Sequence, residues 1–144
     1  MTQPSPLFPL ISTGDLAALT DDPSLRILDA SWHLDGRDAR ADFVRAHLPG
    51  AVFFDLEAVS DQSSPLPHML PAPDDFAREV GRLGVAETDF IVVYDTAGLF
   101  SAARVWWMFR VMGAASVRVL DGGLPADINS VTLSYTFFEV GGKS

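Results

Sequence analysis

The sequence predicts a single α/β domain, with a mostly parallel central sheet and helices on both faces of that sheet. Residues 90–94 are apolar on both alternating sides, which is typical of a parallel strand covered by helices above and below. Shorter apolar runs alternate with segments of helical pattern, and this order favours a parallel sheet. The 144 residues, 48% of them hydrophobic and 20% charged, fit one globular domain.

The first elements are short. Ser12 and Asp15 have the spacing of a capping box, so we expect a first helix from there to about residue 20. Residues 26–30 form a brief apolar run that predicts a buried strand. Residues 38–45 predict one or two helical turns, and residues 51–55 predict a second strand.

Residues 56–72 lack periodicity and are rich in proline, so they predict a long loop of the kind that tends to be functional. Asp74 then opens a helix with acids at its positive end. Its buried face is predicted to comprise Phe76, Val80 and Leu83. Gly84 is placed to end the helix in the left-handed conformation.

The second half continues the alternation. After the central strand at 90–94 comes a loop at 95–100, and Ser101 is the expected N-cap of a helix over 102–112. Residues 117–120 predict a further strand. Residues 131–140 are rich in Thr, Tyr and Phe and predict a strand or an extended tail.

Composition excludes several functions. The chain has no cysteine, which rules out disulfides, thiolate metal sites and a cysteine nucleophile. The net charge of −9 disfavours nucleic acid and anionic membranes as partners. No apolar run approaches the ~20 residues of a membrane span, and no signal peptide is evident, so a cytoplasmic protein is expected. The sequence predicts neither a cofactor nor a metal.

The loop after the central strand is the best candidate for a ligand site, because ligands bind at the carboxyl ends of parallel strands. Its backbone amides and the start of the next helix would form an anion cradle. The cradle comprises Thr96, Ala97, Gly98, Leu99 and Phe100. A nucleophile is expected at the first loop position, which is Asp95, and a carboxylate there would fill or repel the anion site. A phospho-aspartyl role for Asp95 would require a lysine, and the only lysine is Lys143.

Several segments, in this order and spacing, resemble the N-terminal rhodanese domain of the two-domain thiosulfate and 3-mercaptopyruvate sulfurtransferases. They are residues 27–32 (ILDASW), 36–40 (GRDAR), 47–51 (HLPGA), 53–55 (FFD), 67–71 (PHMLP), 93–95 (VYD), 104–110 (RVWWMFR) and 120–123 (LDGG). The resemblance runs from about Leu10 to Pro125 and is closer to the mercaptopyruvate branch.

The resemblance implies a division of labour. In such enzymes the C-terminal domain carries the cysteine that accepts sulfur as a persulfide, and Asp95 stands at the corresponding, degenerate nucleophile position. An acid and a histidine of the N-terminal domain reach a serine of the catalytic loop. The matching residues here are Glu57 and His68, with Glu in place of the family's Asp. An isolated histidine such as His68 is otherwise an ordinary loop residue.

The expected organisation is an N-terminal tail at 1–9, a non-catalytic rhodanese-like domain at 10–126 and an atypical extension at 127–144. We expect half of a sulfurtransferase, inactive alone, whose partner is a C-terminal catalytic rhodanese domain missing from this chain. The alternative is a stand-alone, catalytically dead module that binds a protein or an anion. An exposed apolar interface should make the isolated domain self-associate.

Other conspicuous residues have structural interpretations. His47 is expected to bond a backbone group. At most one of the adjacent Trp106 and Trp107 can occupy the core, because neighbours on a helix point about 100° apart. Arg40 and Arg104, like Arg37, are expected to form solvated ion pairs rather than to bind a substrate anion.

Overall fold

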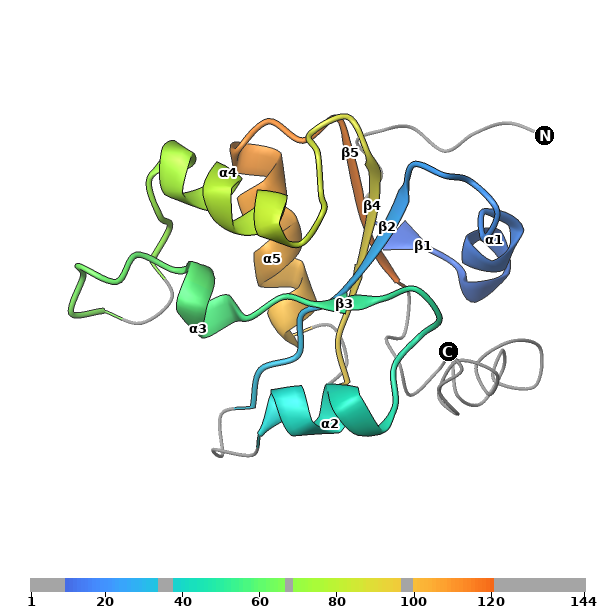
Figure 1. The fold of residues 1–144 in the computed structure, drawn as a ribbon, viewed down its shortest axis with the longest axis horizontal. Helices are drawn as coiled ribbons and strands as arrows, with labels where there is room; N and C mark the ends of the chain where they lie inside the picture. The colour runs from blue at the N-terminus through green and yellow to red at the C-terminus, as the bar shows by residue number, and fades with distance from the viewer. Residues whose placement is uncertain (1–9, 34–37, 67–68, 97–99, 121–144) are drawn as a thin grey trace.

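The computed structural model describes residues 10–33, 38–66, 69–96 and 100–120, the side chain of Phe100 excepted. These residues form a five-stranded sheet in which every neighbouring pair of strands is parallel (Figure 1). The strand order is β1-β5-β4-β2-β3. The strands are β1 (Leu10–Ile11), β2 (Leu25–Asp29), β3 (Val52–Phe53), β4 (Phe90–Tyr94) and β5 (Ser116–Leu120).

Helices connect the strands and cover both faces of the sheet, as predicted. They are α1 (Thr13–Ala18), α2 (Ala39–Arg45), α3 (Leu56–Val59), α4 (Pro73–Arg82) and α5 (Phe100–Val111). Figure 1 shows α4 and α5 on one side of the sheet and α1 on the other. The predicted α/β class with a parallel sheet is therefore confirmed.

The central strand β4 explains why two cores form. Ile91 and Val93 point to one face and pack with buried residues of α4 and α5, including Phe76 and Phe109. Val92 and Tyr94 point to the other face, where they pack in the same cluster as Leu16 of α1. All four β4 residues are fully buried, which accounts for a strand that is apolar on both sides.

The sequence predicted the cap at Ser12 and the glycine that ends α4 at Gly84, but not the cap at Asp38. Ser12 caps α1, its hydroxyl accepting the N–H of Asp15 at 3.1 Å. Asp38 caps α2 in the same way. Gly84 follows α4 with φ of +82°, the left-handed conformation expected for it.

Other boundaries differ from the prediction. Helix α4 begins at Pro73 rather than Asp74, because proline suits the first helical position, where no N–H is needed. Helix α5 begins at Phe100, so the prediction of Ser101 as its N-cap is wrong; Ser101 lies inside the first turn. Strand β1 and helix α3 were not predicted, and α3 lies within the expected loop.

The N-terminal tail at 1–9 and the extension at 127–144 lie outside the described residues, as does the predicted strand or tail at 131–140. Within the described part of the chain, no helix is long and apolar enough to cross a membrane.

Candidate functional site

The carboxyl ends of β2 and β4 meet at one edge of the sheet. The two strands are in register, with Asp29 opposite Tyr94. The segments that follow the two strands are also hydrogen-bonded to each other. Ala30 donates its N–H to the Tyr94 carbonyl at 2.8 Å, and Thr96 donates its N–H to the Ser31 hydroxyl at 3.1 Å. This edge is where the sequence predicted a ligand site.

Asp95 is completely buried at this edge, and its carboxylate reaches the start of α5. Oδ2 accepts the N–H of Ala102 at 2.7 Å, and the hydroxyl of Ser101 lies 3.4 Å from the same oxygen. The first-turn N–H groups of a helix lack partners within the helix and carry its positive end. A carboxylate of the chain itself therefore occupies a donor that an anion would otherwise use.

The rest of the predicted cradle is described only in part. Thr96 is half-buried and tied to Ser31, and the backbone of Phe100 begins α5. Ala97, Gly98 and Leu99 lie outside the described residues. The anion cradle as a whole stays a prediction.

Asp29 is a second buried acid beside Asp95, and it was not predicted as part of the site. Its Oδ1 accepts the N–H of Ser31 at 2.9 Å. Burial raises the pKa of Asp29, the charge of Asp95 raises it further, and hydrogen bonds from Ser31 and Tyr94 oppose the rise. Only the register of two strands brings these acids together, so no local motif reveals the pair.

Glu57 lies in the first turn of α3 with its side chain exposed. Asp55 caps this short helix by accepting the N–H of Ala58 at 3.2 Å. The indole N–H of Trp32, in the segment after β2, donates to Oε2 of Glu57 at 2.7 Å. Trp32 thus fixes one oxygen of this carboxylate, a contact that sequence reasoning missed.

His68 lies outside the described residues, so its proximity to Glu57 stays a prediction. His47 behaves as expected: its Nδ1 lies 2.6 Å from the Phe43 carbonyl, and its ring stacks on that of Phe43. Arg40 pairs with Asp55 at 3.6 Å, as an ordinary ion pair on the surface.

The tryptophan pair divides as predicted. Trp106 is half-buried and donates its indole N–H to the Val117 carbonyl at 2.9 Å. Trp107 is exposed, with Arg104 over its ring. Arg37 lies outside the described residues.

A buried histidine that pairs with an aspartate was also not predicted. His33 is buried and its Nε2 lies 3.0 Å from Oδ2 of Asp42, which also pairs with Arg45. Partial burial disfavours the charged form of Asp42, but the bonds to His33 and Arg45 outweigh that effect and lower its pKa. Among the described residues, no cluster of three or more His, Asp or Glu side chains is arranged to hold a metal ion.

Comparisons with known proteins place this geometry in context. The family described as "Rhodanese-like domain" matches residues 12–129. The chain is 50% identical over 119 residues to the mitochondrial thiosulfate/3-mercaptopyruvate sulfurtransferase 1 of Arabidopsis thaliana, covering 81% of this chain and 31% of that protein. It is 54% identical over 104 residues to the human 3-mercaptopyruvate sulfurtransferase, covering 69% of this chain and 35% of that protein.

Among solved structures, SseA from Escherichia coli, described with the 3-mercaptopyruvate sulfotransferases, superposes with a TM-score of 0.77 at 44% identity. The match covers 82% of this chain and 46% of SseA. The chain thus spans about a third of the length of the curated relatives named above.

Proposed function

The chain belongs to the rhodanese family, and from this premise we propose that it is the non-catalytic N-terminal half of a sulfurtransferase. The complete enzyme would transfer sulfur from 3-mercaptopyruvate or thiosulfate to a thiol or cyanide acceptor. The names of the relatives support this reaction. The chain spans only about a third of their length, which supports a second domain outside this chain.

The observation that carries the proposal is the buried carboxylate of Asp95 on the N-terminus of α5. By family resemblance, this is the position of the cysteine that takes up sulfur in a catalytic domain. An aspartate cannot form a persulfide, and the 144 residues contain no cysteine at all. We therefore expect the chain alone to be inactive.

The role proposed for this half is to supply Glu57 and His68 to the partner domain. Glu57 is exposed, and the indole N–H of Trp32 holds Oε2 of its carboxylate in place. A carboxylate that orients a histidine fixes its tautomer and stabilises its charged form. Glu57 and His68 would then relay a proton to or from the serine of the catalytic loop.

The first test is an assay of the chain alone. Neither thiocyanate from thiosulfate and cyanide nor sulfide from 3-mercaptopyruvate and a thiol should exceed the buffer control. Turnover well above buffer would contradict the proposed inactivity.

The second test is a chimera in which this chain replaces the N-terminal half of the human 3-mercaptopyruvate sulfurtransferase, to which it is 54% identical. We expect the chimera to be active. Glu57→Gln and His68→Asn should each lower its kcat/KM by about a hundredfold, the lower end of the range for acid–base residues. Glu79→Gln, on α4 beside Arg82, is the matched control and should change little. A well-folded but inactive chimera, or full activity in the Glu57 variant, would count against the relay.

The alternative is a stand-alone module that binds a protein or an anion. The chimera also distinguishes this alternative from the sulfurtransferase half. The carboxylate of Asp95 on the Ala102 N–H weakens the anion version. If no cysteine-bearing rhodanese domain is encoded beside this chain or purifies with it, and the chimera is inactive, the stand-alone module becomes the better explanation.

A further inference from the structure

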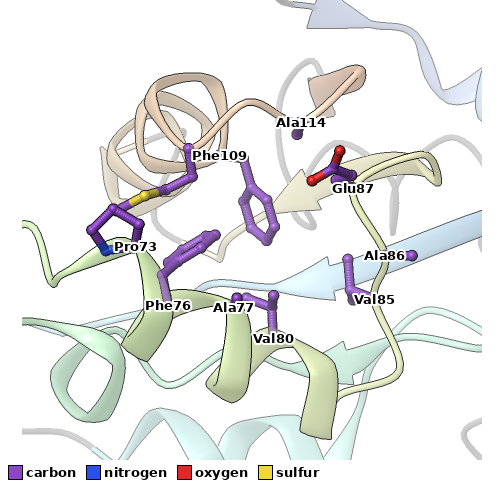
Figure 2. A pocket seen from close by; sticks show the side chains of 10 residues that line it. Pro73, Phe76, Ala77, Val80, Val85, Ala86, Glu87, Phe109 and Ala114 are labelled. Carbon is purple, nitrogen blue, oxygen red and sulfur yellow. The ribbon is translucent and has the colours of Figure 1, made fainter.

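A pocket lies between α4 and α5, in a part of the fold that the proposed function does not use (Figure 2). Its volume is about 140 Å³. It is lined by Pro73, Phe76, Ala77, Val80, Val85, Ala86, Glu87, Phe109, Met112 and Ala114. Glu87 and Ala114 lie on the segments that lead into β4 and β5, so the pocket opens near the amino ends of the strands, opposite Asp95.

The floor of the pocket is apolar and partly aromatic. The rings of Phe76 and Phe109 meet edge to face with centroids 5.0 Å apart, and Val80 and Val85 are buried beside them. An apolar cavity of roughly 150 Å³ in another protein is known to take up benzene. The pocket is therefore large enough for one six-membered ring.

Glu87 is the one charged residue in the lining, and its side chain is exposed. Figure 2 places its carboxylate across the pocket from the two phenylalanine rings. In the described part of the chain, no basic side chain pairs with this carboxylate. An unpaired carboxylate beside an apolar floor favours a ligand with one positive charge.

The loop that carries Glu87 is held firmly at both ends. Asp89 accepts the Ala86 N–H at 2.8 Å and pairs with Arg26, which also donates to the Gly84 carbonyl. Glu87 itself accepts the N–H of Ala115 through its backbone carbonyl at 2.9 Å. The carboxylate is thus presented by an ordered backbone, and Arg26 is engaged elsewhere.

The helix ends add to the same preference. Val80 lies in the last turn of α4, and Met112 directly follows α5, so the negative ends of both helix dipoles lie beside the pocket. An anion placed here would meet Glu87 and two helix C-termini. A cation would be favoured by all three.

We propose that this pocket binds a small primary amine that carries a single aromatic or branched apolar group. The apolar group occupies the space between Phe76 and Phe109, and the ammonium group pairs with Glu87. The proposal does not depend on the sulfurtransferase reaction.

The test is a titration of the isotope-labelled chain followed by ¹H–¹⁵N NMR, with benzylamine, benzyl alcohol and benzoate as probes of matched size. Benzylamine should shift the amides of Ala77, Ala86 and Ala114, and should bind about threefold more tightly than benzyl alcohol, the worth of an exposed ion pair. Benzoate should bind most weakly. Equal affinity for the three probes, or shifts confined to other residues, would overturn the proposal.

Variants separate the two parts of the site. Glu87→Gln should reduce benzylamine binding to the level of benzyl alcohol and leave benzyl alcohol unchanged. Ala77→Leu fills the pocket from an exposed helical position and should abolish binding of both. Ala103→Leu, the same change at an exposed position of α5 outside the pocket, should leave both unchanged. Undiminished binding to a folded Ala77→Leu variant, or an unaltered preference for benzylamine in Glu87→Gln, would refute the assignment.

Discussion

Two buried acids, Asp29 and Asp95, stand side by side at the carboxyl edge of the sheet, and they are stabilised unequally. Asp95 accepts a helix N–H, whereas Asp29 accepts the N–H of Ser31 from its own turn. Burying one carboxylate is costly, and burying two together raises the cost of ionising the second. The pKa of Asp29 is raised because burial, and to a smaller extent the charge of Asp95, disfavours its ionised form.

The first prediction concerns Asp29→Asn. Because the folded-state pKa of Asp29 is raised, the protonated form is favoured by folding. Its contribution to stability is complete below the unfolded-state pKa of about 3.9 and is lost as pH rises through the higher folded-state value. Asparagine keeps an oxygen for the Ser31 N–H but cannot ionise. The variant should therefore gain stability relative to the parent chain as pH rises from 4 to 7.

Urea unfolding of both proteins across that pH range measures the difference. Carboxylates remote from Asp29 titrate alike in both chains and cancel in the comparison. A difference in the free energy of unfolding that stays constant with pH would show that the pKa of Asp29 is not raised.

At the scale of elements, helices and strands long enough to show a hydrophobic pattern could be predicted, and the shortest ones could not. Strand β4 was predicted at its observed bounds because its five residues are all apolar, and four of them are buried on alternating faces. Strand β1 has two residues and depends on pairing with β5, and α3 has four and depends on burying Leu56 and Val59. Neither is long enough to show a period, so both depend on tertiary contacts.

The candidate site divides in the same way. The loop that begins at Asp95 was predicted as a candidate ligand site from a local pattern: it follows a central strand and precedes a helix. Its role as a ligand site stays a prediction. The start of α5 was misjudged because Asp95, across the loop, accepts the N–H of Ala102 in the first turn of the helix. Trp32 on Glu57 and Asp29 beside Asp95 are contacts between distant segments, which one sequence does not reveal.

The second prediction follows from this non-local cap. Asp95→Ala leaves the buried N–H of Ala102 without its acceptor and should lower the free energy of unfolding by about 1–2 kcal/mol. Asp95→Asn retains an oxygen acceptor and should lose less. Both variants remove the charge beside Asp29, so the difference between them isolates the hydrogen bond. Guanidinium denaturation at pH 7 measures it, and equal stability of the two variants would contradict a capping role.

For the whole molecule, net charge and exposed apolar surface act in opposite directions. The chain carries a charge of −9, which makes copies repel one another. Large apolar side chains are nevertheless exposed on α2, α5 and the loop that precedes α4. They are Val44, Leu66, Met69, Trp107 and Val111, of which Val44 is 73% and Val111 49% exposed. Single exposed apolar side chains are ordinary, whereas a contiguous apolar patch marks a surface that a partner covers.

The third prediction is that the isolated chain self-associates, and more strongly as salt is added. At 0.15 M ionic strength the screening length is about 8 Å, which weakens the repulsion but not the apolar contact. Light scattering coupled to gel filtration should give a mass above 15.6 kDa that rises with protein concentration and with salt. Val111→Glu should reduce the association, whereas Ala103→Glu, which adds the same charge at another exposed position of α5, should reduce it less. A monomer at high concentration in 0.5 M salt would show that these side chains do not drive self-association. Equal effects of the two substitutions would mean that the added charge, and not the loss of Val111, reduces the association.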